Sequence, residues 1–269
     1  MPASSPLAAF ARALPAVVIA VVALTSPRLS AQPLAPRHGC DGGRQHCVRP
    51  FITDDARVVG AGLGQMEAWY RGDAESHQQW LLLAYGPTDR LEVTIGGVAG
   101  EDRRSGSLTY ALPLVQGKFL LRPYAEEAPP GMAVILGSFL PGGQGLLKPP
   151  GHGTFGFATI TQALGAKERV LLHANAGVNH LWVDGPDRTI ATWGLGTQAR
   201  AVGGLHVVAE IFSGDPYVPG SGTSWQAGVR HFVSDRLQLD ATAGQGFAGA
   251  VQLPFWVSAG VRWVVGPWR

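Results

Sequence analysis

Two adjacent carboxylates, Asp54 and Asp55, stand just before the first stretch that alternates like a strand, residues 65–71. Paired acids can hold a metal ion or share a proton. Neighbouring side chains of an extended chain point to opposite sides, however, which is poor geometry for a shared ligand. We therefore expect no metal at this pair. Aspartates commonly bond nearby backbone amides in turns, so the pair is predicted to mark the point where ordered structure begins.

Two cysteines, Cys40 and Cys47, lie close together and are flanked by His38 and His46. In an exported protein such a pair favours a local disulfide, and a Cys/His metal site is the alternative. The spacing is neither Cys-x-x-Cys nor Cys-x-x-Cys-His, which excludes zinc-ribbon and c-type haem motifs. No cofactor is expected.

Nucleophilic catalysis would need a serine, a histidine and an orienting acid. The chain contains no Gly-x-Ser-x-Gly motif. The small-residue stretch 220–224 is predicted to be an ordinary loop, with His231 as its nearest histidine. The sequence therefore predicts no enzyme, although a barrel enzyme that acts on lipid stays open as an alternative.

The composition points to β-structure. Only 15% of residues are charged, and the chain has 37 Gly and 8 Trp. Soluble domains usually have nearer a quarter of their residues charged. A low charge with many glycines and aromatics is compatible with a membrane β-barrel. The net charge of +2 is too small to indicate nucleic-acid binding.

The N-terminus has the pattern of a signal peptide. Arg12 precedes an apolar run, residues 14–24, which is short for a membrane helix, and a small residue, Ala31, precedes Gln32. We expect residues 1–31 to be removed during export. Every later apolar run is interrupted by Gly, Pro or charge.

From residue 65 onward, apolar and polar residues alternate with a period of two. In residues 236–244, for example, Leu237 and Leu239 share one face while Gln238 and Asp240 share the other. This pattern predicts about twelve strands, an even number that returns both ends to one side of a single-chain barrel. The expected ranges are 65–71, 78–85, 90–99, 107–121, 132–140, 154–164, 169–182, 189–201, 205–213, 223–233, 236–246 and 254–265.

The predicted connections alternate between tight and loose. Tight ones fall at 86–89, 165–167, 202–204 and 233–235. Looser, Gly- and Pro-rich ones fall at 100–106, 141–153, 183–187, 213–222 and 246–253. Outer-membrane barrels have short periplasmic turns and longer outer loops. One connection, 123–131, is long where a short turn is expected. The motif Thr88-Asp89-Arg90-Leu91 is echoed by Ser234-Asp235-Arg236-Leu237, which predicts the same hairpin chemistry at two turns.

Polar residues on the face opposite the apolar one are predicted to line the lumen. They could form a network that fills a small barrel, because isolated buried charges are costly, or a lining that selects what passes. Asp54 and Asp55 could meet wall arginines if their segment tucks inside. The candidate lining residues are Glu67, Glu92, His173, Asn175, Asn179, Arg200, Glu210, Arg230, Gln238, Asp240 and Arg262.

Three stretches, residues 49–56, 62–67 and 85–92, carry a family resemblance. The chain resembles the transporter-like outer-membrane β-barrel proteins known as "MetA-pathway of phenol degradation" proteins, which open with Arg-Pro-x-x-Thr-Asp-Asp and carry a Tyr-Gly-x-Thr-Asp-Arg-Leu-Glu hairpin. The resemblance implies an outer-membrane channel or uptake protein with hydrophobic or aromatic substrates, and it carries no catalytic residues. The usual C-terminal aromatic residue is replaced by Trp268-Arg269.

These observations predict an all-β protein: a single antiparallel up-and-down transmembrane barrel. Its parts would be a signal peptide (1–31), an N-terminal periplasmic or lumen-plugging segment with a disulfide (32–64) and the barrel (65–269). The expected location is the outer membrane of a Gram-negative cell. The expected partners are membrane lipid, a small solute and the barrel-assembly machinery. A soluble exported β-sandwich or a purely structural barrel is the remaining alternative.

Overall fold

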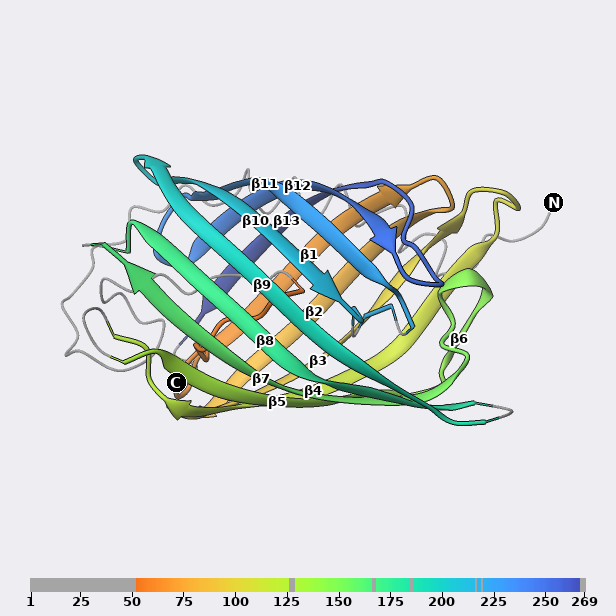
Figure 1. Cartoon of the computed structure of the whole chain (residues 1–269), viewed down its shortest axis with the longest axis horizontal. Coiled ribbons are helices and arrows are strands. Elements are labelled where there is room, and N and C mark those ends of the chain that lie inside the picture. The colour runs from red at the N-terminus through yellow and green to blue at the C-terminus, as the bar shows by residue number, and fades with distance from the viewer. Residues whose placement is uncertain are drawn as a thin grey trace.

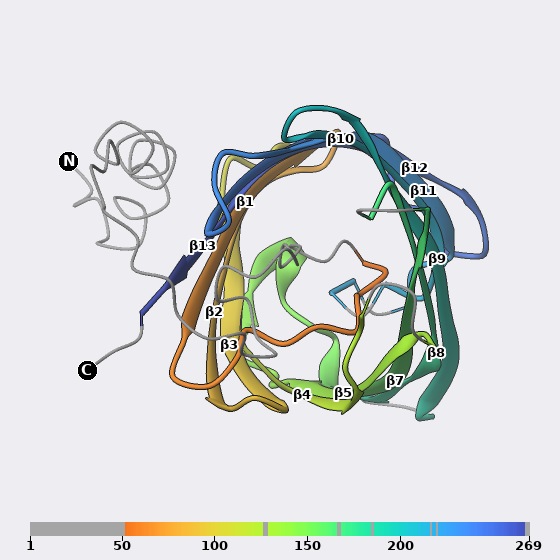
Figure 2. The same ribbon diagram turned by 90° about the vertical axis from the view of Figure 1, so that its left-hand side faces the viewer.

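Twelve long antiparallel strands close into one barrel (Figures 1 and 2). The structure is a computed structural model that describes residues 52–125, 129–165, 168–183, 186–215, 217–218 and 220–266. The expected signal peptide and the pair Cys40–Cys47 lie outside these residues. Within them, no helix is long and apolar enough to cross a membrane. The strands are β1 (Gly64–Asp73), β2 (Ser76–Thr88), β3 (Leu91–Asp102), β4 (Leu108–Arg122), β5 (Gly131–Phe139), β7 (Gly151–Leu164), β8 (Val170–Val183), β9 (Arg188–Val202), β10 (Leu205–Ser213), β11 (Thr223–Phe232), β12 (Leu237–Ala248) and β13 (Trp256–Val265).

The first and last strands complete the ring. β1 pairs with β2 on one side and with β13 on the other, from Gly64 opposite Val265 to Asp73 opposite Trp256. A thirteenth, two-residue strand, β6 (Gly143–Gln144), pairs with β4 inside the β5–β7 connection, ahead of the short 3₁₀ helix η1 (Gly145–Leu147). The prediction of a twelve-stranded up-and-down barrel is confirmed. The closed ring excludes a two-sheet sandwich.

The connections follow the expected asymmetry. The β2–β3 and β9–β10 turns, at the end where β1 begins and β13 ends, have two residues each, whereas the β5–β7 connection at the other end runs from 140 to 150. We call the latter the long-loop end. The exception at 123–130 lies at the end opposite the long-loop end, and the β1–β2 turn at the long-loop end is also tight.

The repeated turn motif forms the same hydrogen bonds twice. Thr88 Oγ1 accepts from the backbone N–H of Leu91 at 3.0 Å, and Ser234 Oγ accepts from that of Leu237 at 3.1 Å. A hydroxyl that bonds the amide three residues on fixes a tight turn, as the sequence echo predicted.

The outer surface is apolar. Large side chains that point away from the lumen are substantially exposed, among them Leu83 (48%), Ile95 (53%) and Leu195 (56%). Soluble proteins rarely expose so many large apolar side chains over a continuous surface. A surface of this kind is suited to contact with the hydrocarbon interior of a bilayer. The alternation of the strands therefore sorts lipid-facing from lumen-facing side chains.

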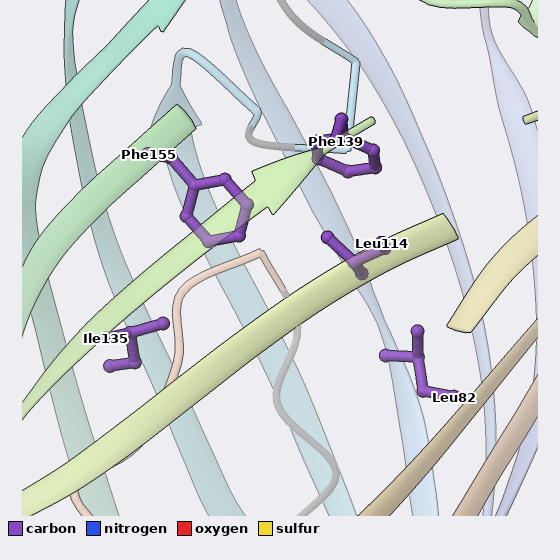
Figure 3. Close-up of a cluster of buried hydrophobic side chains, with 5 residues drawn as sticks. All are labelled: Leu82, Leu114, Ile135, Phe139 and Phe155. Atoms are coloured by element: carbon purple, nitrogen blue, oxygen red, sulfur yellow. The ribbon is translucent and has the colours of Figure 1, made fainter. Parts of the chain in front are cut away.

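The lumen wall has two unlike halves. On β2, β4, β5 and β7 the inward residues include an apolar cluster of Leu82, Leu114, Ile135, Phe139 and Phe155 (Figure 3). On β8 to β13 and β1, the inward residues are mostly polar or charged. Strand alternation predicted the polar half of the lumen wall but not this apolar half.

Candidate functional site

Residues 52–63 lie inside the barrel. They are the orange segment that crosses the ring of strands in Figure 2. The carboxylate of Glu210 on β10 accepts hydrogen bonds from the backbone N–H groups of Ile52 (3.1 Å) and Thr53 (2.7 Å). Gly194 on β9 makes room for this contact, because a Cβ atom there would collide with the side chain of Thr53. The wall thus satisfies backbone groups that a chain outside a sheet would otherwise leave unpaired.

The next residues are held by β7 and β8. Thr159 Oγ1 donates to the carbonyl oxygen of Asp54 at 2.6 Å, and the N–H of Ala56 donates to Thr161 Oγ1 at 2.8 Å. With its amide oriented to satisfy both atoms, Asn175 accepts from the N–H of Asp54 at 2.7 Å and donates to its carbonyl at 3.0 Å. These wall side chains bind the segment much as a neighbouring strand would.

The two aspartates share one lysine. Lys118 Nζ on β4 lies 2.8 Å from Asp54 Oδ1 and 3.3 Å from Asp55 Oδ1, and all three side chains are buried. The expectation that the carboxylates point to opposite sides is wrong, because the segment turns here: Asp55 Oδ1 also accepts from the N–H of Arg57. Burial raises the pKa of Asp54, whereas Lys118 and Arg57 outweigh burial at Asp55 and lower its pKa.

The segment ends against β3. Glu92, which is opposite Lys118 in the ladder, accepts from the N–H of Val59 at 2.8 Å. Arg57 Nη2 lies 3.0 Å from Glu168 Oε1. Apolar contacts accompany these bonds, because Ala56 and Val58 pack with Leu120 in one buried cluster. Charged groups of both signs and apolar contacts therefore fix the segment along its length.

A second polar network connects β1 with β11, β12 and β13. Arg262 donates from Nε and Nη2 to Gln65 Oε1 at 2.8 and 2.6 Å, and Gln65 donates to Glu67 at 2.6 Å. Arg230 donates to Gln198 at 2.7 Å and is paired in register with Asp240. Both arginines are 1% exposed. Such burial is tolerable only with partners of this kind.

Most of the predicted lining residues are buried and face the lumen, but not all of them meet. The segment contacts Glu92, Asn175 and Glu210 directly, and His173 reaches Thr161 at 3.0 Å. Arg200 lies on the inward face of β9, but near the end of the strand at the barrel mouth. It is therefore exposed and lies outside both networks. The buried members are Glu67, Glu92, His173, Asn179, Glu210, Arg230, Gln238, Asp240 and Arg262, and Asn175 is half-buried.

Lys118, Arg57 and Arg71 are lumen residues that were not predicted from the sequence. For Lys118 a signal was available: it alternates with Val115, Phe119 and Leu121, which are all exposed on the outer face. Because these apolar residues point outward, a lysine between them on the same strand must point into the lumen. Arg57 precedes the strands, and no periodicity marks it.

The β10–β11 connection also enters the lumen, from the long-loop end (Figure 2). Its Asp215 is 1% exposed, and its Tyr217 packs on the apolar cluster of the wall. Burial raises the pKa of Asp215 to about 6, although Arg71 opposes the shift.

Two small cavities flank the segment. One, of about 20 Å³, lies between Lys118 and Arg262, and the other, of about 50 Å³, lies beside Arg71 and Asp215. Each cavity has room for one to a few water molecules. Residues 52–63 and the β10–β11 connection therefore occupy part of the lumen.

One serine–histidine pair lies on the outer wall near the long-loop end. Ser138 Oγ is 2.7 Å from His152 Nε2, and Trp182 stacks on the imidazole at 5.0 Å. Ser138 also donates to the carbonyl of Gly153 at 2.9 Å. Among the described residues, no carboxylate lies within 4 Å of His152. In the same part of the chain, no three His, Cys, Asp or Glu residues gather as a metal site.

Solved structures with a similar fold are outer-membrane channels and porins. The COG4313 outer membrane channel from Pseudomonas putida F1 matches with a TM-score of 0.57 at 13% identity, over 81% of this chain and all of that one. The KdgM porin in complex with disordered oligogalacturonate matches with a TM-score of 0.52 at 7% identity, over 74% of this chain and 98% of that one. The NanC porin matches with a TM-score of 0.51 at 6% identity, over 75% and 98%.

At these identities the likeness is one of fold. It supports the expected outer-membrane barrel, but it does not show membership of the "MetA-pathway of phenol degradation" family that the sequence resembles. No curated protein sequence matches the chain. The family model described as "Uncharacterised conserved protein UCP029691" matches residues 46–263, so the chain belongs to that family.

Proposed function

We propose that the protein is a channel or uptake protein of a Gram-negative outer membrane for small hydrophobic or aromatic solutes, and that residues 52–63 keep it closed. The observation that carries the proposal is the divided lumen. Its charged half bonds to itself and to the segment, and its apolar half presents residues such as Phe139 and Phe155. A solute that passes between them meets an apolar wall.

Three further observations support this reading. The exposed outer surface matches a bilayer, with membrane lipid as its partner. Structures of similar fold are named as channels or porins. The motif at residues 49–56 resembles barrel proteins linked to phenol degradation, which favours aromatic solutes. A signal peptide at 1–31, a disulfide between Cys40 and Cys47 and insertion by the barrel-assembly machinery complete the proposal.

The test is single-channel conductance of the full mature chain in planar bilayers, with entry of a fluorescent aromatic dye into vesicles as a second readout. The wild-type protein should conduct little, and a Glu210→Gln variant, which weakens the anchor of Ile52 and Thr53, should conduct more. Glu101→Gln is the matched control, since Glu101 is exposed at the end of β3. If both variants stay closed and no dye enters, the protein is not a channel. Outer-membrane fractionation and heat-dependent gel mobility test the location and the barrel.

The pair Ser138–His152 favours a second function, acyl-ester hydrolysis at the outer leaflet. Its 2.7 Å contact suits a nucleophile and its base once the serine hydroxyl donates to His152 in place of the carbonyl of Gly153. A Ser138→Ala variant that loses hydrolysis of a short acyl ester would establish this function, and no hydrolysis by the wild-type protein would remove it.

A further inference from the structure

The cavity beside Arg71, here called the outer chamber, lies between the β10–β11 connection and strands β1, β12 and β13. Its walls include Trp69, Arg71, Asp215, Tyr217 and Trp256. At about 50 Å³ it is much smaller than the cavity of roughly 150 Å³ that holds a benzene ring. A ring compound can enter only if a wall of the chamber moves.

Tyr217 already places an aromatic ring in the wall. Its ring meets Trp80 edge-on at 5.5 Å, Trp69 at 6.4 Å and Phe139 at 6.2 Å, and Trp69 and Trp80 are themselves stacked at 5.2 Å. Figure 3 shows the blue connection passing next to Phe139. Edge-to-face contacts at these distances are the favoured arrangement of aromatic rings. The three wall rings therefore form a niche shaped for one further ring.

Asp215 brings a carboxylate towards Arg71, the one guanidinium among the described residues that line the outer chamber. No ion pair within 4 Å joins Asp215 to Arg71 in the described part of the chain. The atoms Arg71 Nε and Asp215 Oδ2 are both buried without a hydrogen-bond partner there. Arg71 lies over the ring of Trp256 at 4.3 Å and 3.8 Å from Asp73 Oδ2. A guanidinium so placed can still bind a carboxylate.

The other charges of the chamber are already balanced. Glu67 accepts a hydrogen bond from Gln65 at 2.6 Å, and Asp240 accepts one from Gln238 at 3.2 Å. Asp73 accepts the backbone N–H groups of Glu75 and Ser76 at 2.8 and 2.7 Å. An incoming carboxylate thus meets Arg71 as the cation with bonding capacity to spare.

We propose that Asp215 and Tyr217 occupy the site of a small aromatic carboxylate, which displaces them when it binds. Its carboxylate takes Arg71, and its ring takes the niche of Trp69, Trp80 and Phe139. Gly214 and Gly220, both at positive φ near the ends of the connection, allow the backbone to swing. This inference rests on the proposed function and names its substrate class.

The test is isothermal titration calorimetry of the purified full-length barrel in detergent, with 3-phenylpropionate as the probe. The wild-type protein should bind it, and should bind 3-phenylpropanol, which has the same ring without the carboxylate, at least about tenfold more weakly. Equal binding of the two compounds, or of neither, overturns the proposal. This comparison needs no variant and so does not depend on whether a variant folds.

Three variants, one of them a control, test the displacement and the role of Arg71. Tyr217→Ala should bind 3-phenylpropionate about tenfold more tightly, because the competing ring is gone. Tyr110→Ala, on the outer face of β4, is the matched control and should bind like the wild-type protein. Arg71→Gln should lose the preference for the carboxylate. An unchanged affinity in Tyr217→Ala overturns the displacement.

Calorimetry and conductance separate this inference from the proposed function. Binding without conductance or dye entry, in the wild-type protein and in Glu210→Gln alike, leaves the site standing and refutes the channel. Conductance without binding refutes the site alone.

Discussion

The single lysine that holds Asp54 and Asp55 gives the sharpest prediction. Lys118→Met removes the ammonium and keeps most of the side-chain volume, so two carboxylates are left in a buried position. Removal of one partner from a buried ion pair typically costs about 3–5 kcal/mol. Asp54 can take up a proton, because burial already raises its pKa, so we expect the lower end of this range.

A loss of about 3 kcal/mol lowers the ratio of docked to released segment on the order of 10²-fold. The barrel wall keeps its ladders, so the loss should fall on the segment. We expect more frequent openings in planar bilayers and faster proteolysis within residues 52–63, with unchanged heat-dependent gel mobility.

The matched control is the triple variant Lys118→Met, Asp54→Asn, Asp55→Asn. Replacing both sides of a buried ion pair is far less costly than removing one side, so the triple variant should close again. If Lys118→Met alone stays closed with a protected segment, the ion pair does not hold the segment and the reasoning fails.

Three other predictions follow from separate features. Asp215 has a pKa raised by burial to about 6, so the inward position of its connection is favoured at low pH and loses that advantage as the pH rises towards 6. Openings should increase between about pH 4 and 6 in the wild-type protein, as bilayer recordings can measure, and this increase should be smaller in Asp215→Asn. Gly194→Ala puts a methyl group where Thr53 lies and should release the segment, whereas Gly196→Ala, whose added Cβ would be 3.3 Å from Thr53, should do so less; limited proteolysis ranks the two. Leu195→Arg places a charge in the middle of the outer wall and should destabilise the folded barrel in vesicles by about 2–4 kcal/mol, whereas Val251→Arg, in an exposed loop, should cost little in the same urea titration.

The barrel could be predicted from the sequence because strand alternation is a local property. Lipid on one side and the lumen on the other force every second residue to change character, as at Leu237, Gln238, Leu239 and Asp240. The turns were predictable for the same reason, since Thr88 and Ser234 act on amides three residues away. Both signals lie within a few residues.

The position of residues 52–63 could not be predicted in this way. Its contacts join residues more than a hundred positions apart, such as Thr53 with Glu210 and Asp54 with Thr159. Nothing in a segment without periodicity says which wall side chains will bond its backbone. Asp54 and Asp55 were expected to point to opposite sides because the chain was assumed to be extended there. A local turn instead brings both carboxylates to Lys118.

The occupied charges change what the lumen can select. Polar residues such as Glu210, Asn175 and Glu92 face inward as expected, but their hydrogen-bonding capacity goes to the segment. Arg262 and Arg230 are bonded to glutamines of the wall. A hydrophilic solute would have to break these bonds, and each broken bond leaves a buried group unsatisfied at about 1–3 kcal/mol. An apolar ring on the Phe139 side breaks none of them, and for this reason the divided wall favours aromatic solutes over hydrophilic ones.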